Sequence, residues 1–124
     1  MSVLHVDVPA LAELDRLEDE LARAFGVLRD ALARGDRVVV TVAERDLQGA
    51  GEPVAAALAH GLLGLVRALA IEGRKPGWRI NLLSTPAGVA AEERAAWIER
   101  LGDPAGASGA VVRLGHEHLG RVPA

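Results

Sequence analysis

The sequence contains no cysteine and no tyrosine, and aromatic residues make up only 2% of it. Without cysteine there can be no disulfide, no thiolate metal site and no cysteine nucleophile. The aromatic residues are Phe25, Trp78 and Trp97, too few for the stacking surface that single-stranded nucleic acid needs. A basic excess is also missing, since the net charge is -3 and the isoelectric point about 5.8. These shortages argue against a nucleic-acid partner.

Targeting and membrane signals are also scarce. Residues 1–8 lack the basic start, apolar stretch and small-residue cleavage site of a secretory signal, so we predict a cytoplasmic protein. The longest apolar run, residues 54–71, has the minimum length for a membrane span, but His60, Arg67 and many weakly hydrophobic alanines oppose insertion. We therefore predict no membrane partner. A chain of 124 residues is of ordinary size for one domain, which we place at residues 1–115, with a C-terminal tail at 116–124.

Apolar periodicity predicts three helices. Leucines and Phe25 recur every three or four residues from 10 to 34, and Gly35 follows as a suitable C-cap. Residues 53–72 form a second helix that opens with Pro53 and is apolar nearly all round, so that almost every face of it must be covered. A third helix covers residues 90–101, with Trp97, Ile98 and Leu101 facing inward.

Strands are predicted between these helices, at residues 3–8, 37–43, 79–84 and 110–114, while the polar, glycine-containing stretch 44–52 is interpreted as a loop. Strand and helix alternate throughout, which indicates right-handed crossovers onto a parallel sheet. We predict an α/β protein, a truncated Rossmann-like three-layer half-fold with four parallel strands in sequential order and helices on both faces.

Short motifs give little support to catalysis or ligand binding. Gly49-Ala50-Gly51 precedes a helix, as in a dinucleotide-binding turn, but branched Val54 stands where the last motif glycine belongs. His116 and His118 could supply two imidazoles, yet no third ligand is evident, so we predict no metal site. We expect His60 to be a neutral imidazole satisfied by one hydrogen bond. The serines, at positions 2, 84 and 108, lie in no nucleophile elbow.

Small residues form a strip along one side of the second helix, at Ala57, Gly61, Gly64 and Ala68. Glycine in mid-helix costs about 1 kcal/mol relative to alanine, so some close packing should compensate. Two interpretations stay open. The strip packs on the chain's own sheet, or it allows close contact between helices of two subunits.

Residues 61–72, which read GLLGLVRALAIE, and the following Trp78-Arg79-Ile80-Asn81 resemble the short-chain dehydrogenase/reductase family. In the same alignment, residues 35–40 resemble the strand that leads to that family's catalytic serine, and residues 108–112 resemble its last strand. The resemblance covers most of this chain but only the C-terminal half of the family's fold. It extends to the structural half of polyketide-synthase ketoreductases and to the N-terminal region of some long 3-oxoacyl reductases.

The family's functional residues do not carry over. Ala55 and Ala59 stand at the YxxxK positions, and Val42 or Ala43 stands at the catalytic serine. Asn81 is the only asparagine and belongs to a predicted strand, so it does not match the catalytic asparagine of the first helix. The glycine-rich cofactor loop and the family's three N-terminal strands have no counterpart here. We therefore predict no catalytic residue, no cofactor, and no binding of NADH or NADPH.

The first functional hypothesis is a non-catalytic subunit, a pseudoenzyme that homodimerises or pairs with a full-length reductase through its two long helices. Fatty-acid or polyketide metabolism is the context that the resemblance implies. The candidate contacts are Leu17, Leu21, Phe25, Leu28, Ala57, Gly61, Gly64 and Ala68. The alternative is a module that binds a small ligand or an acyl carrier through the loops near 44–52 and 84–88, at the strand C-termini. An enzyme of unfamiliar chemistry ranks third.

Overall fold

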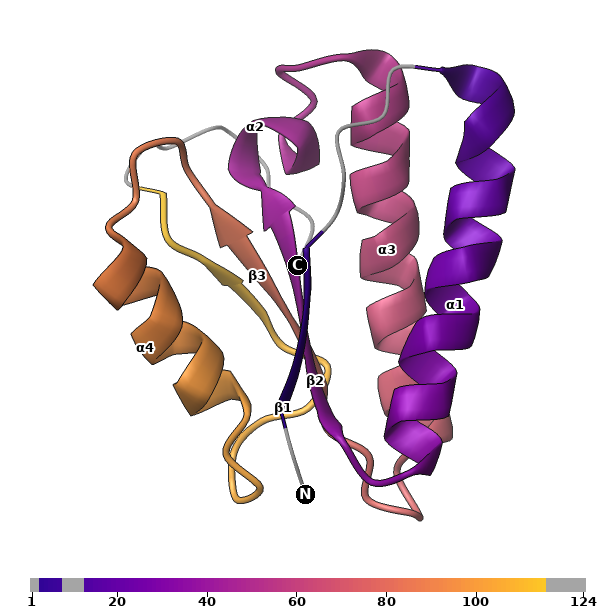
Figure 1. Ribbon diagram of the computed structural model, residues 1–124, viewed down its shortest axis with the longest axis vertical. Helices are drawn as coiled ribbons and strands as arrows, with labels where there is room; N and C mark the ends of the chain where they lie inside the picture. The colour runs from indigo at the N-terminus through magenta and orange to yellow at the C-terminus, as the bar shows by residue number, and fades with distance from the viewer. Residues whose placement is uncertain (1–2, 8–12, 116–124) are drawn as a thin grey trace.

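The computed structural model describes residues 3–7 and 13–115 (Figure 1). Its centre is a four-stranded parallel sheet in the order β1-β2-β3-β4. The strands are β1 (Val3–Asp7), β2 (Arg37–Ala43), β3 (Ile80–Thr85) and β4 (Val111–Arg113). Inner strands of such a sheet are covered on both faces and therefore read as continuous apolar runs. The run of valines in β2 is an example. The predicted α/β class and the sequential parallel order are confirmed.

Two long helices and two shorter ones surround the sheet. They are α1 (Leu17–Ala33), which follows a 3-10 turn, η1 (Leu14–Arg16), then α2 (Glu44–Leu47), α3 (Pro53–Glu72) and α4 (Ala91–Leu101). Gly35 has a φ of 93° just after α1, which is the left-handed backbone expected of a glycine at a helix end. The predicted first helix started at residue 10. Residues 8–12 lie outside the described part of the chain, so only the range from Leu14 on can be compared.

The prediction of a loop over residues 44–52 is wrong at its first turn, because α2 begins directly after β2. Leu47 is 2% exposed and anchors this turn to the core. A helix of four residues gives too short an apolar period to be recognised in a sequence. The rest of the stretch is a turn, with a positive φ at Gly49.

Each face of the sheet has its own core. Val38, Val40 and Val42 pack with Ile80 and Leu82 against α1 and α3. On the opposite face, Val39, Leu83 and Val112 pack against α4 through Trp97, Ile98 and Leu101. Fully burying one Val or Leu side chain contributes about 1.5–3 kcal/mol, so these two layers account for most of what holds the fold together.

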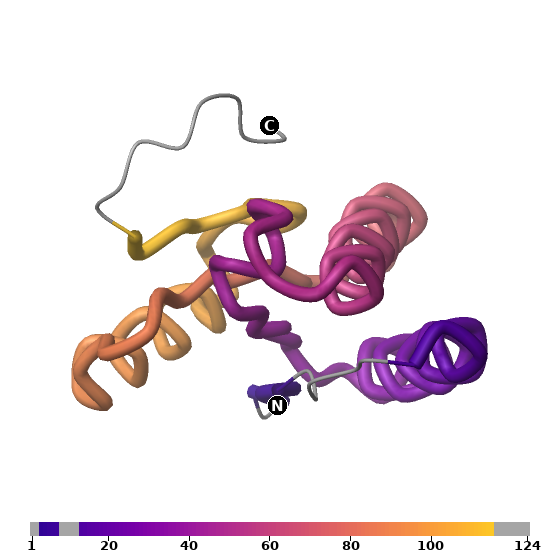
Figure 2. Tube along the Cα trace, turned by 90° about the horizontal axis from the view of Figure 1, so that it is seen from above, coloured from indigo at the N-terminus to yellow at the C-terminus, as the bar shows by residue number. Residues whose placement is uncertain are grey.

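The crossover that contains α4 has the opposite hand to the other two. Because the strands follow one another in one direction, right-handed crossovers throughout would place every long helix on the same face. Figures 1 and 2 place α1 and α3 on one face of the sheet and α4 on the other. The expectation of uniformly right-handed crossovers is therefore wrong for β3-α4-β4, which is left-handed. This path lets α4 cover Val39 and Leu83, which α1 and α3 cannot reach.

The apolar helix α3 is only partly covered. By length and composition it could cross a membrane, with a mean hydropathy of 1.9, and 33% of that window is buried. Its buried side is Leu58, Ala59, Leu62, Leu63, Val66 and Leu69. This packing against a sheet is that of a helix in a soluble α/β fold. The outward side of α3 is open within the chain, so the cover predicted for that side would have to come from another chain.

Candidate functional site

An apolar groove runs along the outer surface of the two long helices, between α1 and α3. It has a volume of about 610 Å³ and is lined by Leu14, Leu17, Glu18, Leu21, Ala22, Phe25 and Leu65. Leu14 is 72% exposed and Phe25 is 40% exposed. Glu18 is the only charged residue in this lining. Soluble monomers rarely expose a large contiguous apolar surface, and such a surface usually marks an interaction site.

The outward side of α3 continues the groove as an uncharged strip. From residue 53 to 71 the exposed positions carry no Asp, Glu, Lys or Arg. They are Pro53, Ala57, His60, Gly64, Ala68 and Ile71. Ordinary surface helices place charged residues on the side away from the core. We refer to the groove and this strip together as the α1/α3 face.

The structure divides the candidate contact residues into two groups. Leu28 is 0% exposed and belongs to the core, so it does not contribute to an outer surface. Gly61 faces α1, because a Cβ added there would lie 2.7 Å from Cδ2 of Leu21. Gly61 and Leu21 therefore form the close approach between the chain's own helices. A Cβ at Gly64, by contrast, meets nothing within 4 Å.

Ala57 and Ala68 are exposed like Gly64, while Leu17 is half-buried against the core. The small-residue strip is thus divided between α1 of the same chain and the surface, and a contact between subunits stays a prediction. Gly61 allows packing within the chain, and Ala57, Gly64 and Ala68 remain on the surface. The exposure of Leu14 and Ile71 could not be assigned from the sequence, because an apolar side chain at a helix end is equally compatible with burial.

A second pocket lies at the carboxyl ends of the strands, where open α/β sheets place ligands. Its volume is about 600 Å³. The lining comes from α2 and the segment after it and from the loop between β3 and α4: Glu44, Arg45, Gln48, Pro86, Ala87, Gly88, Val89, Ala90 and Glu93, with Leu114. Both loops named by the sequence analysis thus contribute to one pocket.

An ion pair between Glu44 on α2 and Arg113 on β4 lies at the same end of the sheet. The carboxylate of Glu44 accepts from Nε of Arg113 at 3.1 Å, and the Glu44 side chain is 6% exposed. Removing one partner of such a pair leaves a buried charge without compensation. Sequence analysis missed this pair. The signal that could have found it is an arginine inside an apolar strand together with a glutamate directly after another strand.

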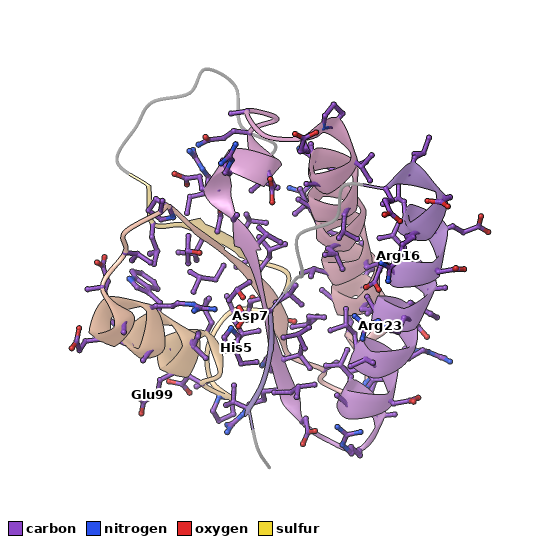
Figure 3. The ribbon with its side chains drawn as sticks, turned by 45° about the horizontal axis from the view of Figure 1, so that its top comes forward. His5, Asp7, Arg16, Arg23 and Glu99 are labelled. Atoms are coloured by element: carbon purple, nitrogen blue, oxygen red, sulfur yellow. The ribbon has the colours of Figure 1, made fainter. Side chains whose placement is uncertain are left out.

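Four polar side chains meet at the other edge of the sheet, between β1 and α4. Thr41 and Arg94 both donate to the carboxylate of Asp7, and His5 lies 3.3 Å from the same oxygen (Figure 3). Burial opposes ionisation of Asp7, but the Thr41 hydrogen bond and the charges of His5 and Arg94 outweigh it, so the pKa of this carboxyl lies below its ordinary value. The cluster ties β1 to β2 and α4.

The weak motifs have structural roles where the structure describes them. Nε2 of His60 donates to the carbonyl of Leu47 at 2.7 Å, which confirms the expected single hydrogen bond and links α3 to α2. Gly51 packs against the side chains of Asp46 and Arg45, since an added Cβ would lie 2.9 Å from Oδ1 of Asp46 and 3.1 Å from Nε of Arg45. His116 and His118 lie outside the described residues, within which no group of three metal-ligating side chains occurs.

Ala59, at the family's lysine position, and Asn81, the only asparagine, are also structural. Ala59 is 2% exposed in the core under α3. Asn81 lies on β3, as predicted, and is fully buried. Its amide nitrogen donates to the carbonyls of Leu101 and Ala107, and its Oδ1 accepts from the backbone of Ala110.

No protein-family model matches the sequence, and no curated protein matches it significantly. Among solved structures the fold is similar to a crystal structure assigned as an NAD(P)-dependent gluconate 5-dehydrogenase from Beutenbergia cavernae, with NADP bound at low occupancy. The TM-score is 0.59 and the sequence identity 26%, over 90% of this chain and 64% of that chain. The present chain thus spans less than two thirds of the length of that protein. The likeness shows a fold of the short-chain dehydrogenase/reductase type.

Proposed function

We propose that this protein is a non-catalytic subunit of the short-chain dehydrogenase/reductase type, which assembles through the α1/α3 face with a second copy of itself. The observation that carries the proposal is the exposed, nearly uncharged surface of two long parallel-packed helices. A twofold contact places such a surface against its own copy and removes Leu14, Phe25 and Ile71 from water. A full-length reductase with a similar face is the other partner that the resemblance implies.

The positions that the family uses for catalysis support a non-catalytic role. The chain has no tyrosine, and Ala59, at the lysine position of the resemblance, is enclosed in the core. A lysine there would be buried without a partner. The phosphate-binding turn is not matched either, since Val54 stands where its last glycine belongs. A cytoplasmic location and a role in fatty-acid or polyketide metabolism remain predictions from the sequence.

Light scattering during size exclusion tests the assembly. We expect the wild type to have the mass of a dimer at micromolar concentration and Gly64→Glu to have the mass of a monomer, because the substitution buries a charge in the contact. Gly64 is well suited to this change, since nothing lies within 4 Å of an added Cβ and the chain's own packing is left intact. Ala96→Glu, on the exposed side of α4, is the matched control and should stay dimeric.

The proposal fails if the folded wild type is a monomer at high micromolar concentration, alone and when mixed with candidate reductases. It also fails if Gly64→Glu and Ala96→Glu keep the same mass. Circular dichroism of each variant shows whether it is folded.

The pocket at the strand carboxyl ends supports a second candidate, a module that binds a small ligand or an acyl carrier. Calorimetry with acyl-pantetheine as probe tests this function. Saturable binding that disappears in Ala90→Trp, a change that fills the pocket, and persists in Gly64→Glu would favour the module over the subunit. Absence of binding would exclude the acyl-carrier form of this candidate.

A further inference from the structure

A basic pocket lies at the end of the molecule opposite the strand carboxyl ends, at the lower end of α3 in Figure 1. It has a volume of about 590 Å³, within the usual range for small-molecule sites. Three arginines contribute to its lining: Arg67 on α3, Arg74 on the turn that follows, and Arg79 just before β3. Trp78 and Ser108 are the other hydrogen-bonding or aromatic residues of the lining.

The three arginines have no carboxylate partner within the described residues. No Asp or Glu lines the pocket, and none of the three forms an ion pair there. The arginines that do form ion pairs in the described part of the chain are Arg23, Arg29, Arg34, Arg94 and Arg113, each with an Asp or Glu. Unpaired cations that share one cavity repel one another, and an anion bound there would relieve that repulsion.

Three carbonyls at the end of α3 already accept backbone hydrogen bonds, which weakens their repulsion of an anion. Leu69 accepts from Gly73, Ile71 accepts from Arg74, and Gly73 accepts from both Gly77 and Trp78. The negative end of the helix dipole favours cations such as Arg67 and Arg74. It does not account for Arg79, which comes from beyond the turn.

The wall of the pocket is fixed before any ligand binds. Trp78 packs directly on Gly73, where an added Cβ would lie 2.4 Å from its Cβ. The carbonyl of Trp78 accepts from Oγ of Ser108 at 3.0 Å, and Nε of Arg79 donates to the carbonyl of Pro104 at 3.1 Å. Ile71, which is 69% exposed, adds an apolar edge. A rigid aromatic and apolar wall beside cations lowers the ordering cost of binding.

We propose that this pocket binds a small phosphorylated molecule whose remainder is planar or apolar. A guanidinium group donates two parallel hydrogen bonds to two oxygens of a phosphate group. Trp78 and Ile71 can contact the planar or apolar part of the ligand. The site goes beyond the proposed subunit function and shares no residue with the uncharged part of the α1/α3 face other than Ile71.

The two tryptophans give a direct test. In the ¹⁵N-labelled full chain, the indole N–H signals of Trp78 and Trp97 can be followed together by NMR, with Trp97→Phe to assign them. Inorganic phosphate and phenyl phosphate are the probes. We expect the Trp78 signal to shift saturably while the Trp97 signal stays in place, and phenyl phosphate to bind more tightly than inorganic phosphate.

Arg67→Gln and Arg74→Gln should each raise the Kd for phenyl phosphate about tenfold. Arg23→Gln, an exposed arginine on α1 labelled in Figure 3, should leave it unchanged. The proposal is overturned if the Trp78 shift does not saturate, if Trp97 shifts equally, or if Arg23→Gln weakens binding as much as the pocket variants. Arg74 is exposed, so its variant tests the site even if Arg67→Gln does not fold.

Discussion

Asn81 illustrates how a buried polar residue holds separate segments together. One side-chain amide reaches the carbonyls of Leu101 and Ala107 and the backbone N–H of Ala110. It thereby fixes the connection from α4 to β4. The sequence identified Asn81 as a strand residue, but its partners are 20 to 29 positions away, and no local pattern encodes such distant contacts.

Asn81→Ala should therefore lower the free energy of unfolding by about 3 kcal/mol, because it leaves two carbonyls and one N–H without partners. Urea denaturation followed by circular dichroism measures this loss. Gln48→Ala is the control, since Nε2 of Gln48 has no partner among the described residues, and it should change stability by less than about 1 kcal/mol. Equal effects of the two variants would contradict the role given to Asn81.

Asp7 should make the protein less stable in acid. Its pKa lies below the ordinary value when the chain is folded, so its contribution is present above the unfolded pKa of about 3.9 and is lost as the pH falls through the folded pKa. The stability difference between wild type and Asp7→Asn should be constant near neutrality and shrink below about pH 4. The side chain is 63% exposed, so added salt should reduce the difference as well. A difference that grows on acidification would be contrary to this account.

At the scale of elements, apolar period predicted most helices and strands well. The bounds of α3 and β2 agree with the prediction, because proline, glycine and a valine run mark their ends. The apolar periodicity did not predict which residues of a helix's apolar stripe are buried by neighbouring elements. Phe25 and Leu28 lie three residues apart, roughly 60° around the helix axis, yet one is 40% exposed and the other 0%. That difference depends on where α3 packs, which the sequence of α1 does not contain.

The glycines of α3 and its C-cap should respond to alanine in opposite ways. In the monomer, Gly64→Ala should raise the free energy of unfolding by up to about 1 kcal/mol, because helix propensity improves and the new methyl group meets nothing within the chain. Gly73→Ala should lower it by about 1–3 kcal/mol, since the methyl group would overlap Cβ and Cγ of Trp78. Its φ of -85° suits alanine, so backbone strain is not the cause. Urea denaturation at one matched protein concentration gives both values, and a shared sign would refute the argument.

At the scale of the whole molecule, the order and direction of the strands were predictable, but the position of α4 was not. Alternation of strands and helices fixes a parallel sheet, whereas the face that each helix covers depends on which apolar residues remain open. Val39 and Leu83 face away from α1 and α3 and require cover. The two pockets differ in the same way in how far the sequence predicts them. The pocket at the strand carboxyl ends was predictable from topology, while the basic pocket depends on a turn that brings Trp78 against Gly73 at the end of α3.

Assembly should also appear in thermal stability. If the native state is a dimer, each tenfold rise in protein concentration adds about 1.4 kcal/mol to the free energy of unfolding by mass action. For a dimer of this size that corresponds to roughly 3–6 °C in Tm. Calorimetric scans at two concentrations measure the shift. Gly64→Glu should have a Tm independent of concentration, while Ala96→Glu should keep the wild-type dependence. A wild-type Tm that does not change with concentration would mean that the α1/α3 face stays exposed to water, and the exposed Leu14 and Ile71 would then need another explanation.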